Sequence, residues 1–160
     1  MDRMGTPFTI TRSTTIDAAP EAVRAQVTDF RRWVDWSPWE GLDPQLTRTY
    51  TGPETGVGSS YAWEGNKKAG AGTMRILRDE PGLVEVALEF SRPFPARNTV
   101  EFVLSSPAGD RTRVDWIMHG ELNPLMRLFS LVKSMDSMMG PDFERGLAQL
   151  KRATEASVSG

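Results

Sequence analysis

The sequence contains no cysteine and only one histidine, His119. Without cysteine the chain can form no disulfide, no thiolate zinc site and no cysteine nucleophile. A single histidine also excludes a metal site built from two imidazoles. We therefore expect no metal and no cofactor, and we expect the core alone to stabilise the fold.

Long apolar runs and clusters of like charge are missing as well. No stretch reaches the roughly 18 apolar residues that a membrane span needs, and residues 1–7 lack the basic start and apolar centre of a signal peptide. The 19 basic and 21 acidic residues are scattered and give a net charge of -2, which argues against a nucleic-acid surface or a polybasic membrane anchor. These features predict a soluble cytoplasmic protein and leave its oligomeric state open.

The chain has 160 residues, a length typical of one domain, and such a domain buries roughly 68 to 70% of the surface that its unfolded chain exposes. Neither an internal repeat nor a low-complexity linker divides it. We predict a single domain over residues 1–160, with an ordered core at about 8–153 and a frayed, small and polar tail at 156–160.

The first forty residues predict a strand followed by two short helices. Apolar residues alternate along 8–16, which indicates a strand. Pro20 fits the first turn of a helix, where its missing N–H would have had no partner. A second short helix is expected over 30–36, and Ser37-Pro38 ends it.

The middle of the chain has the pattern of an antiparallel meander, in which short runs of alternating hydrophobicity are separated by turn residues. The predicted strands cover about 45–51, 58–65, 70–78, 83–91, 97–106 and 111–121. One parity of these strands collects the large apolar side chains, and the other is mostly charged. The apolar parity comprises Tyr61, Trp63, Met74, Ile76, Val84, Val86, Leu88, Phe90, Val100, Phe102, Leu104, Val114, Trp116 and Met118.

Residues 124–153 predict a long helix that covers the apolar face of this sheet. Its apolar stripe has helical spacing. We expect Gly140-Pro141 to kink or restart the helix, because proline cannot donate to the helical ladder. The stripe consists of Leu128, Val132, Met135, Met139, Phe143, Leu147 and Leu150.

The order of these elements resembles the START-like superfamily, also called SRPBCC, and in particular its polyketide cyclase/dehydrase-like group. The similarity rests on segments 15–23, 29–39, 61–66, 70–74, 88–94, 112–120 and 142–151, and it covers nearly the whole chain. It implies an α+β helix-grip fold, as in Bet v 1, with a curved seven-stranded antiparallel sheet wrapped around a long C-terminal helix. The resemblance also implies a cavity between sheet and helix. It does not fix the function, because one fold serves many functions.

The inner face is rich in bulky, polarizable side chains, which suit irregular apolar ligands. A filled, dry core is the alternative interpretation. If a cavity exists, we expect Trp39 to be the tryptophan of segment 33–39 nearest to the ligand. The residues expected to bind the ligand are Trp39, Tyr61, Trp63, Met74, Phe90, Phe94, Asn98, Trp116, Met118, Met135 and Met139.

Polar side chains on the inner parity could orient a ligand. Tyr61 is the best candidate, since a buried hydroxyl needs a partner, and Asn98 shares its parity. Arg12 would have to be paired if buried. Parity places His119 outward, so a solvated charge cluster is expected there, and Asn66 is expected to be a turn residue.

No catalytic constellation is recognisable. No segment has the nucleophile-elbow pattern G-x-S-x-G, and the glycines at 56, 58, 70 and 72 do not extend to a phosphate-binding motif. Three functions stay open. The chain could bind a small hydrophobic molecule, such as a lipid-, polyketide- or isoprenoid-like compound. It could be a polyketide cyclase or dehydratase-type enzyme that uses the same cavity, or a regulatory or co-chaperone-like interaction module with a filled core.

Overall fold

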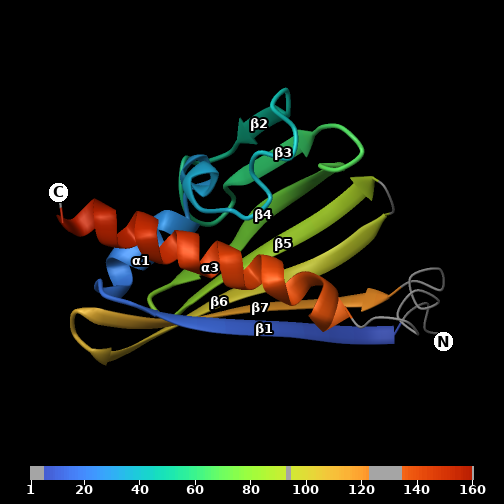
Figure 1. Cartoon of the computed structure of the whole chain (residues 1–160). Coiled ribbons are helices and arrows are strands. Elements are labelled where there is room, and N and C mark those ends of the chain that lie inside the picture. The colour runs from blue at the N-terminus through green and yellow to red at the C-terminus, as the bar shows by residue number, and fades with distance from the viewer. Residues whose placement is uncertain (1–5, 93–94, 123–134, 160) are drawn as a thin grey trace.

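The computed structural model describes residues 6–92, 95–122 and 135–159. Seven antiparallel strands form one sheet in the order β1-β7-β6-β5-β4-β3-β2, and α3 crosses its concave face (Figure 1). The elements are β1 (Thr6–Ile16), α1 (Pro20–Val27), the 3-10 helix η1 (Phe30–Asp35), β2 (Thr47–Thr51), β3 (Ser60–Glu64), β4 (Ala71–Glu80), β5 (Leu83–Arg92), β6 (Ala96–Ala108), β7 (Arg111–Leu122) and α3 (Met135–Ser159). The predicted α+β helix-grip architecture is confirmed.

The two short helices form where the sequence predicts them. Pro20 occupies the first turn of α1, where a missing N–H costs no helical hydrogen bond. Asp29 caps η1 by accepting a hydrogen bond from the backbone N–H of Arg31. The second helix is a 3-10 helix, which is common for pieces this short.

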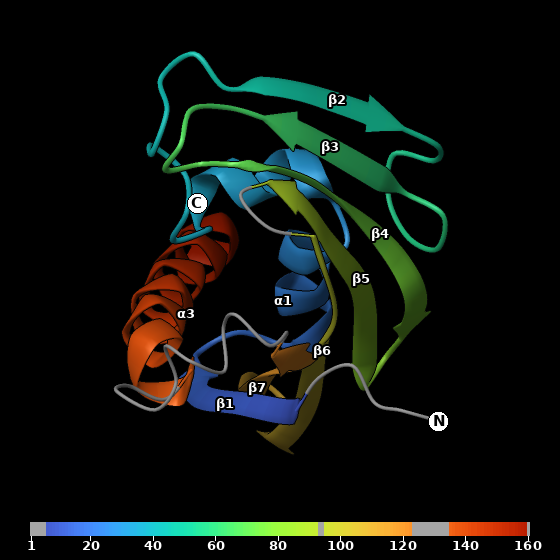
Figure 2. The ribbon, with the colours of Figure 1, turned by 90° about the vertical axis from the view of Figure 1, so that its right-hand side faces the viewer.

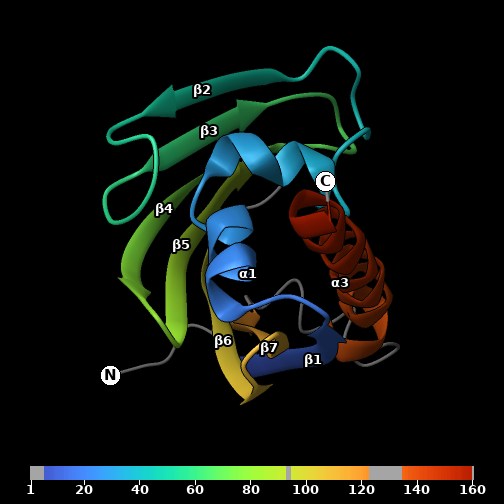
Figure 3. The same ribbon diagram turned by 90° about the vertical axis from the view of Figure 1, so that its left-hand side faces the viewer.

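The sheet is strongly curved, and the helices lie inside its curve (Figures 2 and 3). The register between β4 and β5 shifts twice, between Ala71 and Gly72 and between Ile76 and Arg78. Such irregularities bend a strand and increase its twist. The bend brings β2 and β3 over the helices, so that one sheet provides both the floor and a side wall of the interior.

The long C-terminal helix differs from its prediction in two places. The helix runs through Pro141 as one element and ends at Ser159, so neither a restart at Gly140-Pro141 nor a frayed tail from residue 156 is found. The physical reason is packing: Phe143, Leu147 and Leu150 are buried, and Thr154 is buried near the C-terminal end. The predicted helical residues 124–134 lie outside the described residues.

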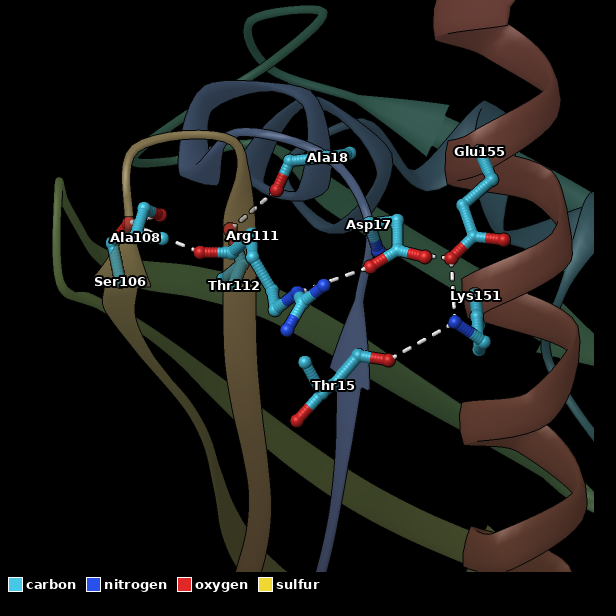
Figure 4. A network of polar contacts seen from close by, with 9 residues as sticks. All are labelled: Thr15, Asp17, Ala18, Ser106, Ala108, Arg111, Thr112, Lys151 and Glu155. Atoms are coloured by element: carbon cyan, nitrogen blue, oxygen red, sulfur yellow. Dashed lines mark hydrogen bonds and ion pairs between the residues drawn. The ribbon is translucent and has the colours of Figure 1, made fainter.

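A polar network attaches the C-terminal half of α3 to the sheet (Figure 4). Lys151 donates to the carbonyl oxygen of Thr15 at 3.2 Å and pairs with Glu155 at 2.6 Å. Glu155 in turn accepts from the backbone N–H of Asp17 at 2.9 Å. These contacts fix the position of α3 relative to the end of β1.

The core lies on the sheet face that the sequence predicts. All fourteen side chains of the apolar parity belong to the core on the concave face, and all but Trp63, Met74 and Phe90 are buried. The opposite parity is exposed or half-buried. His119 lies on this outer face with 49% of its side chain exposed, beside Glu101 at 3.3 Å and Thr9 at 3.4 Å, as its parity predicts.

Candidate functional site: a cavity between the sheet and α3

A cavity of about 230 Å³ lies between the concave face of the sheet, the segment after η1 and α3. Its wall is mainly aromatic and aliphatic. The lining residues are Trp33, Ser37, Trp39, Glu40, Leu42, Leu46, Tyr61, Trp63, Lys68, Ala69, Met74, Leu88, Phe90, Val100, Trp116, Met118, Met139 and Phe143. Within the described sheet, the lining residues come from β3, β4, β5, β6 and β7.

Period-two alternation places the strand residues of this wall. Trp63 on β3 pairs in register with Gly72 on β4, and a Cβ at Gly72 would stand 2.6 Å from Cη2 of the Trp63 ring. The missing side chain therefore leaves room for the indole to lie along β4. Trp63 then packs edge-on against Phe90 at 5.6 Å and donates its Nε1 hydrogen to the carbonyl oxygen of Ala69 at 2.9 Å.

The helix side of the cavity is formed by α3. Phe143 stacks on Trp116 with ring centroids 4.4 Å apart and an interplanar angle of 16°. Gly146 allows this close approach, since a Cβ there would stand 2.8 Å from Cζ3 of Trp116 and 2.8 Å from Cδ of Pro38. Met139, one helical turn before Phe143, also lines the cavity.

The segment after η1 adds aromatic rings from the third side. Trp39 stands edge-on to Trp116 at 5.9 Å and to Phe143 at 6.1 Å. Trp33 and Trp36 are buried and contact Phe102 edge-on, each at 5.9 Å. Trp33 and Trp36 pack the segment of η1 against the sheet, while Trp33 and Trp39 line the cavity.

Four polar residues, Tyr61, Glu40, Lys68 and Ser37, are part of the lining, and Glu40 forms an ion pair with Arg48. Burial raises the pKa of Tyr61 to about 12, and the negative charge of Glu40 adds to this effect. The phenol therefore stays protonated at neutral pH and acts as a hydrogen-bond donor.

One tryptophan of the wall carries a buried N–H group without a partner. The Nε1 atom of Trp116 is buried and has no hydrogen-bond acceptor in the part of the chain that the structure describes. The whole side chain is only 1% exposed. Buried N–H groups without a partner are rare in folded proteins.

The structure brings most of the predicted site residues together. Trp39, Tyr61, Trp63, Met74, Phe90, Trp116, Met118 and Met139 all line the cavity. Asn98 is buried and points inward as its parity predicts, but it lies beside Gly120, and is absent from the cavity wall. Phe94 and the side chain of Met135 lie outside the described residues.

Two further polar candidates have structural roles. Arg12 reaches across to α3 and forms ion pairs with Asp136 and Glu144, both at 2.9 Å, so it is paired and does not line the cavity. Asn66 accepts hydrogen bonds from the backbone N–H groups of Lys68 and Ala69 at 3.0 and 2.9 Å. It is a turn residue, as predicted.

Sequence reasoning missed a group of lining residues in the connections. Residues 37–46 and 68–69 contribute six of them, and period-two alternation says nothing about segments outside strands. The helix stripe could have identified Phe143, because it follows the predicted Met139 by four residues. Leu88 and Val100 share the parity of Tyr61 and could also have been included.

A second hollow lies outside, between η1 and the C-terminal half of α3. It is an open groove of about 860 Å³ with polar walls, including Arg32, Gln149 and Arg152. Ser37 and Glu40 line both the groove and the apolar cavity. The segment that contains them is thus the wall that separates the two spaces.

The described fold and cavity define a helix-grip protein with an internal apolar site. Residues 7–155 match the model of the family described as polyketide cyclase / dehydrase and lipid transport, and the chain belongs to this family. No curated protein sequence matches the chain. No helix among the described residues is long and apolar enough to cross a membrane.

Solved structures confirm the fold. Norcoclaurine synthase from Thalictrum flavum, in complex with dopamine and hydroxybenzaldehyde, is similar with a TM-score of 0.69 and 8% identity over 96% of this chain and 89% of that chain. The ZhuI aromatase/cyclase from a Streptomyces species has a TM-score of 0.65 and 12% identity over 95% and 96% of the two chains. A protein from Chromobacterium violaceum has a TM-score of 0.65 and 15% identity over 92% and 96%. Family and fold together support a ligand-binding or cyclase-type role.

Proposed function

We propose that this protein binds a small, largely apolar molecule with one or two rings in the cavity between the sheet and α3. The observation that carries the proposal is the cavity itself. Interiors of proteins are normally packed with few voids larger than a water molecule, whereas here about 230 Å³ is left open between aromatic and methionine side chains. Such walls suit flat or irregular apolar ligands.

The volume limits the size of the ligand. A dry apolar cavity of about 150 Å³ can hold a benzene molecule, and pockets for drug-sized ligands start at about 300 Å³. A cavity of about 230 Å³ therefore fits one or two fused rings better than a long acyl chain. Among the lipid-, polyketide- and isoprenoid-like compounds that the sequence leaves open, compact ones are favoured. The ligands in the norcoclaurine synthase complex, dopamine and hydroxybenzaldehyde, are also single-ring compounds.

The test compares two neighbouring methionines on α3. Met139 lines the cavity, while Met138 is 46% exposed. We expect Met139→Trp to fill the cavity and to weaken binding of naphthalene at least about tenfold, because the added ring occupies the space of the ligand. Isothermal titration calorimetry of both variants measures the effect.

Met138→Trp is the matched control and should bind naphthalene as the wild type does. Equal binding by wild type and Met139→Trp would show that the probe binds elsewhere. No binding by the wild type to any one- or two-ring probe would contradict the proposed function.

One observation favours a second function, cyclase- or dehydratase-type chemistry in the same cavity. Tyr61 presents a protonated phenol to the cavity, close to the Glu40–Arg48 ion pair, and such a hydroxyl can donate a hydrogen bond to a ligand oxygen on which negative charge develops. For this function Tyr61→Phe should abolish turnover and preserve binding. A Tyr61→Phe variant with unchanged turnover would remove the phenol from the chemistry.

A further inference from the structure

Lys68 is the exposed residue of the cavity wall. All other residues that line the cavity are buried or half-buried, whereas Lys68 lies in the turn between β3 and β4 and is open to solvent. The cavity therefore reaches the surface at this turn. Lysine commonly lays its aliphatic stem along apolar surface and keeps its ammonium group in water, so the mouth of an apolar cavity is a suitable place for it.

The ammonium group of Lys68 has no hydrogen-bond or ion-pair partner among the described residues. Its backbone N–H donates to the side-chain oxygen of Asn66 at 3.0 Å and so fixes the turn. The neighbouring Lys67 is exposed as well, but it does not line the cavity. Lys68 therefore brings to the apolar space a positive charge that no described residue neutralises.

The acidic groups next to this turn are already engaged. Glu40 forms an ion pair with Arg48. The two carboxylate oxygens of Asp43 each accept a backbone N–H group, at 2.9 and 2.8 Å. Glu64, at the end of β3, lies 3.8 Å from an arginine of β5. None of these three carboxylates is left for Lys68, so a counter-ion has to come from outside the chain.

We infer that the ligand is a small apolar acid, with its ring or rings in the cavity and an anionic group, such as a carboxylate, paired with the ammonium group of Lys68 at the mouth. This inference rests on the proposed function and specifies the charge of the ligand for the same cavity. An anion at the mouth stays partly hydrated, which avoids the large cost of burying an unpaired charge. An amine is the wrong class for this wall, because the carboxylate of Glu40 already has a cation beside it.

The ring next to the anionic group has a surface to lie on. Trp63 donates its Nε1 hydrogen to the carbonyl oxygen of Ala69, the residue after Lys68, at 2.9 Å. It also packs edge-on against Phe90 at 5.6 Å. The indole of Trp63 thus lies beside the turn that carries Lys68. An aromatic acid can contact both at once, with its anion on the ammonium group and its ring on the indole.

The experiment uses two probes of nearly equal shape, 2-naphthoate, which is anionic at neutral pH, and 2-naphthamide, which is neutral. Isothermal titration calorimetry measures both probes with the wild type, Lys68→Met and Lys67→Met. Methionine keeps most of the aliphatic stem and removes the charge. Lys67 is the matched control, because it is exposed and lies outside the lining. The quantity compared is the ratio of the two Kd values, naphthamide over naphthoate.

We expect this ratio to fall about two- to fivefold from the wild type to Lys68→Met at low ionic strength, which is the usual strength of one partly exposed ion pair. Lys67→Met should keep the wild-type ratio. In about 1 M sodium chloride, where the screening length is roughly 3 Å, the difference between the wild type and Lys68→Met should shrink. Binding of naphthamide by Lys68→Met shows that the variant is folded.

The outcomes separate the inference from the proposed function. If neither probe binds to the wild type, the cavity is not a ligand site and the proposed function fails. If both probes bind and Lys68→Met has the wild-type ratio, the cavity binds ligands but the pairing with Lys68 is wrong. An equal fall of the ratio in Lys67→Met and Lys68→Met would show that only the general positive charge of the turn acts, which overturns the assignment to Lys68.

Discussion

Gly72 lies beneath the Trp63 ring, where a Cβ would stand 2.3 Å from the carbonyl oxygen of Glu89 and 2.6 Å from Cη2 of Trp63. The first neighbour is backbone and cannot turn away. At the residue scale, the site therefore depends on a missing side chain as well as on the large ones that line it. Gly146 has the same role under Trp116.

Gly72→Ala tests this dependence. We expect the variant to lose about 1 to 3 kcal/mol of stability, the usual cost of overpacking, and to bind naphthalene more weakly because the Trp63 ring is displaced. Gly109→Ala is the control, since nothing lies within 4 Å of a Cβ there. Urea denaturation and calorimetry measure the two effects. A Gly72→Ala variant as stable as Gly109→Ala would contradict the packing argument.

Individual residues could be assigned to a face from the sequence, but not to a place along that face. Asn98 shows the difference, because its inward direction is correct and yet it lies beside Gly120, away from the cavity wall. Alternation reports only the side of the sheet that a residue faces. Where a cavity lies along the strands depends on the bend of the sheet and on the loops above it, which have no periodic pattern.

At the scale of elements, Arg12 joins the edge strand β1 to the first three turns of α3. It contacts Asp136 through two hydrogen bonds, each of 2.9 Å, and Glu144 through one of 2.9 Å. Gly140 lies between these two acids, and a Cβ there would collide with the guanidinium group. The contact holds the helical turns that carry Met139 over the cavity.

The hydrogen bond from Arg12 holds the pKa of Asp136 below its ordinary value of 3.8. A carboxylate whose pKa is lower in the folded state stabilises the fold above its unfolded pKa, and this contribution is lost as the pH falls through the folded pKa. We expect Asp136→Asn to lower the Tm by a few degrees at most at neutral pH, since the pair is partly exposed. The difference from the wild type should disappear in strong acid.

Thermal unfolding monitored by circular dichroism over a pH series measures this linkage, with Asp110→Asn in the distant β6–β7 hairpin as the control. A Tm difference that is independent of pH would show that Asp136 acts through packing rather than through its charge.

The strands and short helices were predictable because each follows a local pattern: alternation for the strands, proline and turn residues for the boundaries. The path of α3 was harder to predict. A proline predicts a break from local geometry, whereas the buried side chains of Phe143, Leu147 and Leu150 stabilise one continuous helix through contacts that are distant in sequence.

At the scale of the whole molecule, a curved sheet closed by one helix encloses a space that its own side chains do not fill. The alternative of an interaction module predicts a filled core, and the open cavity of about 230 Å³ argues against it. The exposed large apolar residues are scattered over η1, the loop before β3, β4 and the two ends of α3, as is normal for a protein surface; they are Val34, Val57, Leu77, Met138 and Val158.

The most direct test of the account is native mass spectrometry of freshly purified protein, followed by incubation with naphthalene-sized probes and by organic extraction of any bound compound. Wild type should carry the added mass of one small molecule, and Met139→Trp should remain at its apo mass. A wild-type protein that stays at its apo mass with every probe would contradict the central claim that this cavity is a ligand site.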